Sequence, residues 1–220
     1  MNTTRFFSSP ASQIRRYPEL NRIPDFGKRA EKLILQRLQR SPDFPVLQTP
    51  HLSDNVANYP SQIDRYTLNC APATAWQAYT EIRPDEMWQG DLVRFLYAYS
   101  KPNDAFYYKD QEDMPKVHAG LQIFCMLWFG RAFGVVGIEI LEINAAKQLV
   151  SLAYLEGGIF KGLQHLRFYP HPNDQTEIVH ESWRKPLEGK EWARFLPYVF
   201  MHRKTIGEYH QAMKNRIKNQ

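Results

Sequence analysis

The longest regular pattern of apolar positions lies near the C-terminus, between residues 191 and 217. Its large apolar residues recur at intervals of three, four or seven: Trp192, Phe195, Val199, Ile206, Met213 and Ile217. Such intervals place all of them on one side of an α-helix. Pro197 predicts that the regular helix begins near Leu196, with residues 192–195 in a preceding turn. We therefore expect one long C-terminal helix whose apolar side must be buried.

Apolar runs of strand length, separated by turn residues, precede this helix. The pattern predicts a first strand at 61–69, a short helix at 74–82 that Pro84 ends, a second helical piece at 85–99, a polar loop over the sheet opening at 100–116, and strands at 117–129, 132–143, 148–156, 161–169 and 176–184. This order predicts an α+β fold in which a strongly curved antiparallel sheet wraps around the C-terminal helix. Such a sheet usually encloses a cavity.

Residues 1–60 differ from the rest because they hold seven of the 15 prolines. Proline removes amide donors and interrupts ladders, so we expect an irregular arm around one helix at 25–40. That helix has an apolar face of Phe26, Ala30, Leu33, Ile34 and Leu38 and a basic opposite face. We divide the chain into this arm (1–60) and a domain (61–220). Docking of the basic helix onto its own domain is favoured over peripheral contact with a membrane.

The predicted hairpin at 136–156 is apolar on both faces, whereas the C-terminal helix covers only one. We expect Ile138, Ile140, Leu149, Ala153 and Leu155 on one face, and Leu141, Ile143, Val150, Leu152 and Tyr154 on the other. A bare outer face of this size is adhesive. We therefore predict that the arm covers it through Phe26, Leu33 and Ile34, or that a second copy does so. We therefore expect the protein to be a monomer or a homodimer.

The formal charge of +5 is unevenly distributed. Residues 1–60 carry nine Lys/Arg and five Asp/Glu, net +4; residues 61–183 carry ten and fifteen, net −5; residues 184–220 carry nine and three, net +6. Basic ends of this kind attract anionic partners, but they are more often solvated helix faces. We expect no specific nucleic-acid partner.

Cysteine content and the first residues indicate a reducing compartment. Cys70 and Cys125 stand far apart and in no redox or metal-binding spacing. The start, MNTTRFFSSPASQIRRYPEL, lacks the apolar core of a secretory signal. We therefore expect a cytoplasmic protein with reduced thiols.

Candidate site residues come first from the last two predicted strands. If these pair across a compact turn, His165 lies opposite His180, and Gln164 lies opposite Glu181. Alternation then places Gln164, Leu166, Phe168, Val179, Glu181 and Trp183 on the cavity face. Burial would raise the pKa of Glu181 and make it a general acid or base; the alternative is a salt-bridged or exposed glutamate. No third ligand joins the histidine pair, so we expect no metal site.

The C-terminal helix adds His202, which lies on its inner side between Val199 and Ile206. Such a histidine is either a hydrogen-bonded core residue or a polar group of the cavity. The large aromatic residues pack in the core or line the cavity. The expected ligand-binding set is Trp88, Tyr154, Gln164, Glu181, Trp183, Val199 and His202.

The order of elements resembles the START-like superfamily (SRPBCC, helix-grip), which includes polyketide cyclases and lipid-transfer domains. The resemblance covers about residues 60–217 and rests on the entry IDRYTLNCAPATAWQAYTEI and the exit EWARFLPYVFMHRKTIGEYHQAMK. Within it, VVGIEILEI, LAYLEGGIFKGLQHLRFYP and TEIVHESWRKP are loosely similar to a bacterial family of unknown function. The resemblance implies a pocket between sheet and long helix for an apolar or aromatic small molecule, and it transfers no catalytic residue.

Three functions are consistent with these observations. The first is binding or transport of a small hydrophobic molecule, with no cofactor. The second is a cyclase or dehydratase that uses Glu181 or His202 as its acid/base group. The third is an interaction module that acts through its basic ends. The sequence contains no G-x-S-x-G elbow, phosphate-binding glycine loop or Cys-x-x-Cys pair.

Overall fold

The computed structural model of the protein describes residues 18–23, 49, 56–109, 111–129, 132–195 and 197–219. This part contains one antiparallel sheet of eight strands in the order β1-β8-β7-β6-β5-β4-β2-β3. The strands are β1 (Ser61–Leu68), β2 (Val93–Ser100), β3 (Ala105–Tyr108), β4 (Leu121–Phe129), β5 (Ala132–Asn144), β6 (Leu149–Tyr154), β7 (Phe160–His171) and β8 (Gln175–Pro186). The helices are η1 (Leu20–Arg22), η2 (Val56–Asn58), α2 (Pro72–Thr80), α3 (Pro84–Met87), η3 (Glu191–Phe195) and α4 (Tyr198–Lys218).

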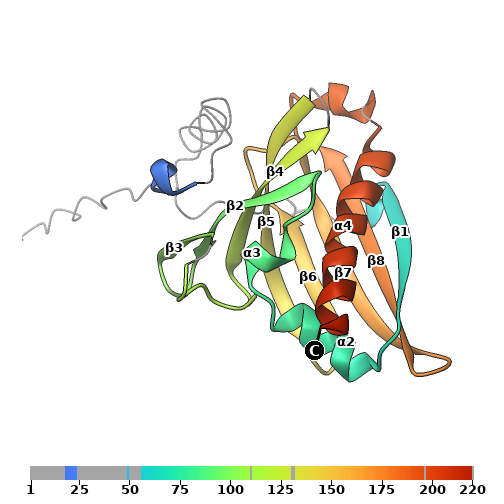
Figure 1. The fold of residues 1–220 in the computed structure, drawn as a ribbon. Coiled ribbons are helices and arrows are strands. Elements are labelled where there is room, and N and C mark those ends of the chain that lie inside the picture. The colour runs from blue at the N-terminus through green and yellow to red at the C-terminus, as the bar shows by residue number, and fades with distance from the viewer. Residues whose placement is uncertain are drawn as a thin grey trace, which may run out of the picture.

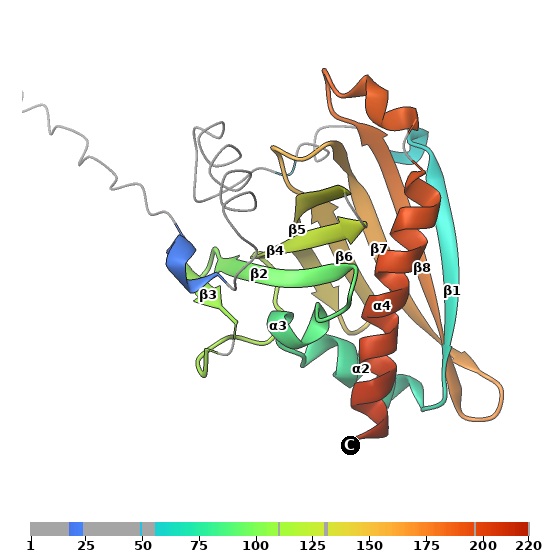
Figure 2. The ribbon, with the colours of Figure 1, turned by 45° about the horizontal axis from the view of Figure 1, so that its top comes forward.

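Helix α4 lies along the concave side of the curved sheet, in front of β7 and β8 (Figure 1). Its C-terminal end packs against α2 and α3, whereas its N-terminal end continues from η3 at the opposite end of the sheet (Figures 1 and 2). The main core fills the space between the sheet and these helices. This is the α+β helix-grip fold that the sequence predicts.

The buried stripe of α4 follows the helical period but is rotated from the predicted stripe. Its buried residues are His202, Thr205, Ile206, Tyr209, His210 and Met213. Val199 is 47% exposed and Trp192 is 53% exposed, so neither packs in the core. The inner side of α4 therefore carries more hydroxyl and imidazole groups than the apolar pattern indicates.

The prediction of a helical piece at 85–99 is wrong for most of its length. Only the short α3 is helical, and β2 follows as a strand. Seven of the eight residues of β2 are buried, because main-core and outer-face side chains are both covered. Strand β3 lies within the predicted polar loop.

The predicted β7–β8 register is wrong by one residue, and the predicted β5–β6 register is wrong by one residue up to Ile140 and by two nearer the turn. His165 of β7 pairs with Glu181 of β8, and Gln164 pairs with Ser182. In the β5–β6 hairpin Ile138 pairs with Tyr154, and the register shifts beyond Ile140. A slip of one residue moves side chains to the other face of a sheet, so the predicted cavity face of β8 is the outer face.

A second apolar cluster lies on the outer face of the sheet, and part of the arm packs against it. The cluster comprises Leu96, Tyr97, Tyr108, Phe124, Met126 and Leu155, with Ile23 of the arm packed beside it. The backbone N–H of Glu19 donates to the Tyr108 hydroxyl at 2.5 Å, and the Arg22 guanidinium lies 4.3 Å from the centre of the Tyr108 ring. The predicted contacts of Phe26, Leu33 and Ile34 lie outside the described residues. Within the described ranges, no helix has the length and apolar content needed to cross a bilayer.

Candidate functional site: a cavity between the sheet and helix α4

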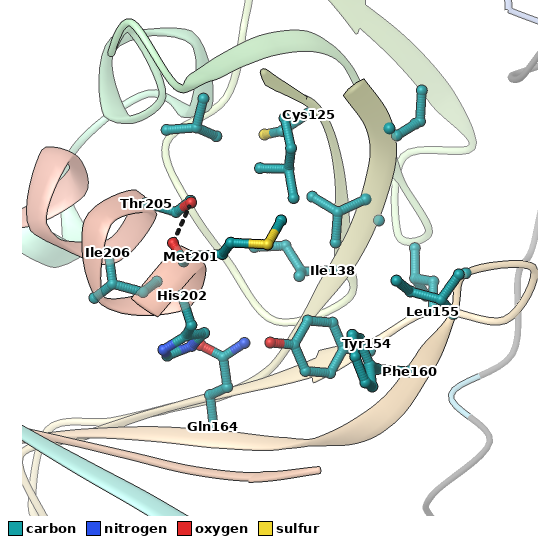
Figure 3. A pocket seen from close by; sticks show the side chains of 18 of the residues that line it. Cys125, Ile138, Tyr154, Leu155, Phe160, Gln164, Met201, His202, Thr205 and Ile206 are labelled. Atoms are coloured by element: carbon teal, nitrogen blue, oxygen red, sulfur yellow. Dashed lines mark hydrogen bonds between the residues drawn. The ribbon is translucent and has the colours of Figure 1, made fainter. Parts of the chain in front are cut away.

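A cavity of about 420 Å³ lies between the concave face of the sheet and α4 (Figure 3). Most of its wall is apolar: Trp88, Val93, Cys125, Leu127, Val136, Ile138, Leu152, Leu155, Phe160, Met201, Ile206 and Tyr209 contribute to it. Its lining residues that keep some exposure include Gly134, Gly157 and Trp192. These residues define the mouth, at the end of the sheet where η3 precedes α4.

Polar side chains gather on one wall of this cavity. Tyr154, Gln164 and His180 come from the sheet, and His202 and Thr205 come from α4. Figure 3 shows His202 beside Gln164, with the Tyr154 hydroxyl directed toward the same region. The Thr205 hydroxyl donates to the backbone carbonyl of Met201 at 3.0 Å, so it is already satisfied within its own helix.

A chain of hydrogen bonds fixes the orientation of the buried histidines behind this wall. The Gln164 Oε1 atom lies 2.9 Å from His180 Nε2, and because an amide oxygen only accepts, His180 Nε2–H is the donor. The neutral ring then presents an acceptor at Nδ1 to His210 Nε2, 3.4 Å away. His210 Nδ1 in turn accepts from the Tyr79 hydroxyl at 2.6 Å. Each imidazole therefore uses both of its nitrogens.

The same series of hydrogen bonds extends toward the cavity from Gln164 to Tyr154. Burial raises the pKa of Tyr154 to about 12, although side-chain hydrogen bonds with Tyr198 and Gln164 oppose this shift. The bond between Tyr154 and Tyr198 joins their two hydroxyls. Burial also raises the pKa of Tyr198 well above its ordinary value. Both tyrosines are therefore protonated at neutral pH.

His202 differs from the other two histidines because neither of its ring nitrogens has a hydrogen-bond partner. The side chain is 8% exposed and stacks on the Tyr198 ring at 5.1 Å between centroids. Burial lowers the pKa of His202 to about 4, and Arg184 acts in the same direction, whereas Asp64 opposes the shift. At neutral pH the ring is an uncharged group with one donor and one acceptor unused.

Among the described residues that line the cavity, none is Asp, Glu, Lys or Arg. The Arg184 guanidinium lies 3.5 Å from the centre of the Tyr198 ring but outside the lining. Asp64 accepts from Arg203 at 2.8 Å and is likewise outside it. Burial raises the pKa of the Cys125 thiol well above its ordinary value, so this lining group is no thiolate nucleophile.

The structure places the predicted site residues in two groups. Trp88, Tyr154, Gln164 and His202 line the cavity. Glu181, Trp183 and Val199 do not: Glu181 pairs with Arg167 at 3.2 Å on the outer face, Trp183 lies edge-on to His165, and Val199 is exposed. The removal of Glu181 and Trp183 from the cavity is a correction that follows from the register slip.

The sequence pattern does not predict that His180 and Tyr198 line the cavity, nor that His210 bonds to His180 behind the polar wall. The predicted register places His180 on the outer face, because it differs by one residue from the register that the β7–β8 turn sets. Asn173 and Asp174 have positive φ values of 62° and 54°, and both residue types tolerate that conformation. A three-residue loop at 172–174 is the signal that places His180 inside.

Metal binding finds no support in the described part of the chain, where no three His, Cys, Asp or Glu side chains are grouped to hold an ion. His165 and His180, the only pair of histidines that the predicted register brings together, lie on opposite faces of the sheet. The expected absence of a cofactor stays a prediction.

The cavity and the gripped helix give the chain a helix-grip fold with an internal pocket, the architecture that the sequence resemblance implies. No protein-family model matches the chain, and no curated protein matches it. Norcoclaurine synthase from Thalictrum flavum has a TM-score of 0.52 at 9% identity, over 76% of this chain and 91% of that chain. The same protein in complex with dopamine and hydroxybenzaldehyde gives 0.52 at 9% identity, over 79% and 96%. The protein TTHA0849 from Thermus thermophilus gives 0.49 at 8%, over 73% and 98%. At such low identity, the two norcoclaurine synthase structures establish the fold alone.

Proposed function

We propose that the protein binds a small, uncharged, mostly apolar molecule whose hydrogen-bonding group meets His202. The observation that carries this proposal is the unsatisfied imidazole of His202, buried beside an apolar cavity. A buried polar group without a partner costs about 1–3 kcal/mol. A ligand hydroxyl or carbonyl at this position would recover that free energy.

The charge of the ligand follows from the lining. The free energy needed to move an ion into a cavity without a counter-ion is far larger than the free energy gained from one hydrogen bond. Since none of the described lining residues is ionised, the ligand is neutral. A volume of about 420 Å³ falls within the range typical of small-molecule pockets. The solved complex of norcoclaurine synthase with dopamine and hydroxybenzaldehyde supports the capacity of this fold to hold hydroxylated aromatic molecules.

Two fluorescent probes with the same aromatic body test both parts of the proposal. N-phenyl-1-naphthylamine is neutral and carries one N–H donor, whereas 1-anilinonaphthalene-8-sulfonate adds a negative charge. We expect the neutral probe to bind with a fluorescence increase and the sulfonate to bind at least about tenfold more weakly, because its charge loses hydration without gaining a cation. Equal affinities would contradict the neutral-ligand assignment.

A variant at the mouth locates the binding. A Cβ atom at Gly134 meets no other atom within 4 Å, and residue 134 lies on the same face of β5 as Val136 and Ile138, which also line the cavity. Gly134→Phe should therefore fill the mouth with little backbone strain and abolish probe binding. Gly207→Ala, also in open space but on α4 outside the cavity lining, is the matched control. Retained binding by Gly134→Phe would place the probe elsewhere.

Acid/base catalysis is the second candidate function, and the unused nitrogens of His202 are what favours it. Glu181 is withdrawn from this role because it lies outside the cavity. With its pKa lowered to about 4, His202 is a weak base. A reaction that depends on it should lose turnover in His202→Gln with little change in KM, whereas a ligand contact should change binding alone.

A further inference from the structure

Exposed large apolar residues gather where the cavity opens. Six such residues occur in the described part of the chain, and three of them lie between residues 192 and 200: Trp192 is 53% exposed, Val199 47% and Phe200 58%. Trp192 also lines the cavity. Val199 and Phe200 belong to the first turn of α4. Large apolar groups clustered on a surface mark an interaction site.

Basic side chains accompany these apolar residues. By sequence, residues 184–204 contain six Lys/Arg and two Asp/Glu, net +4. The Lys204 ammonium lies 4.5 Å from the centre of the Phe200 ring. A shallow outer groove runs beside them, lined by Arg184, Tyr198, Val199, Phe200, Arg203 and Lys204. Arg203 remains exposed although it pairs with Asp64. We call Trp192, Val199, Phe200 and Lys204 the mouth patch.

We propose that the mouth patch docks the protein on an anionic lipid bilayer, with the cavity opening toward the membrane; this rests on the proposed binding of an apolar molecule. Aromatic and aliphatic side chains bury themselves at the boundary of headgroups and acyl chains, and adjacent lysines contact anionic headgroups. Tyr198 links the two compartments, because it lines both the inner cavity and the outer groove. A molecule that leaves the bilayer at this point enters the cavity without crossing water.

Charge favours a bilayer over a second copy of the chain as the occupant. A two-fold dimer brings the same patch of both protomers together, so the Lys204 ammonium and the neighbouring basic groups of one protomer would face those of the other. An anionic membrane supplies the complementary sign. Control residues are available at the opposite end of the sheet, far from the cavity mouth (Figure 1). Lys147 lies in the β5–β6 turn, and Tyr169 lies near the β7–β8 turn.

Vesicle co-sedimentation of the full chain tests the docking. Vesicles of phosphatidylcholine are compared with vesicles that also contain phosphatidylserine. We expect binding to the anionic vesicles that weakens with added salt. Lys204→Gln should weaken partitioning about fivefold, since one cation near the surface contributes about that factor. Phe200→Ser should weaken it about tenfold or more. The matched controls, Lys147→Gln and Tyr169→Ser, should bind like the wild type.

Several results would overturn the docking. These are absence of sedimentation with anionic vesicles, an equal loss in the control variants, or a Phe200→Ser variant that changes only the protomer number in analytical ultracentrifugation. Displacement of the vesicles by a short single-stranded DNA at equal phosphate concentration would instead assign the patch to nucleic acid. The neutral probe, titrated without vesicles, reports on the cavity separately. Phe200→Ser should leave that titration unchanged, so failure of docking and failure of the proposed ligand binding are distinguishable.

Discussion

Mild acid should lower the free energy of unfolding steeply. In His202→Phe, the number of protons taken up on unfolding should fall by about one. Burial lowers the pKa of His202 to about 4 and that of His210 to about 3. Burial, together with the other two histidines, also lowers the pKa of His180 well below 6.5. Burial also lowers the pKa of His165 to about 4. Through these four histidines the unfolded chain therefore binds up to four more protons than the folded chain as pH falls below 6.5.

The sign and size of the effect follow from linkage. Stability rises with pH wherever the unfolded state binds more protons. It is therefore complete above the unfolded pKa of about 6.5 and is lost as pH falls toward 4. With about 1.4 kcal/mol per proton and pH unit, four histidines give a loss of about 5 kcal/mol per unit near pH 5. That is a large part of the roughly 5–15 kcal/mol typical of a folded domain.

Urea unfolding at pH 7.5, 6.0 and 5.0, followed by circular dichroism, measures this dependence. In His202→Phe the slope should fall by about 1.4 kcal/mol per pH unit, because one buried imidazole is gone. At pH 7.5 the variant should be as stable as the wild type or about 1 kcal/mol more stable, since no unsatisfied nitrogen remains buried. His171→Gln, at the exposed β7–β8 turn, is the control for loss of a histidine. Identical slopes in wild type and His202→Phe would refute the reasoning.

Two further predictions concern the attachment and rigidity of α4. Gly207 lies inside this helix, and a Cβ atom added there would meet nothing within 4 Å. Gly207→Ala should therefore raise the free energy of unfolding by about 1 kcal/mol and the Tm by about 2–4 °C, as measured by calorimetry. No increase would show that the site is strained. The Glu208 carboxylate accepts from the backbone N–H groups of Leu92 and Val93 at 2.9–3.1 Å. Glu208→Gln should cost about 1–3 kcal/mol in urea unfolding, and an unchanged midpoint would mean that these bonds contribute nothing net.

The order of elements could be predicted because most of them bury only one face. The 3.6-residue period of α4 and the strand-length runs of β4 to β8 are visible in the apolar positions. Strand β2 breaks this rule, since its residues are buried toward both the main core and the outer cluster. With no alternation along β2, the intervals between Leu92, Phe95 and Leu96 match a helix equally well.

The arm is predictable in outline but not in its contacts. The need for a cover on the outer face follows from two apolar faces in one hairpin, and Ile23 does pack on that side. Which residue of the arm reaches the sheet depends on irregular backbone, for which apolar periodicity carries no information. The Tyr108 ring that holds Arg22 lies in a stretch whose polar composition predicts a loop.

The identity of the polar wall depends on a single residue of register between β7 and β8. Either register buries a comparable set of apolar side chains, so hydrophobic pattern alone does not separate them. The polar residues of β8 do separate the two registers. The predicted register buries Glu181 on a wall with no cation, whereas the observed register buries His180 with Gln164 as its partner at 2.9 Å. A neutral imidazole with both nitrogens bonded is far less costly to desolvate than a carboxylate. Glu181 on the outer face instead meets Arg167 at 3.2 Å. The cost of burying charge therefore selects the register, and with it a cavity whose polar wall is uncharged.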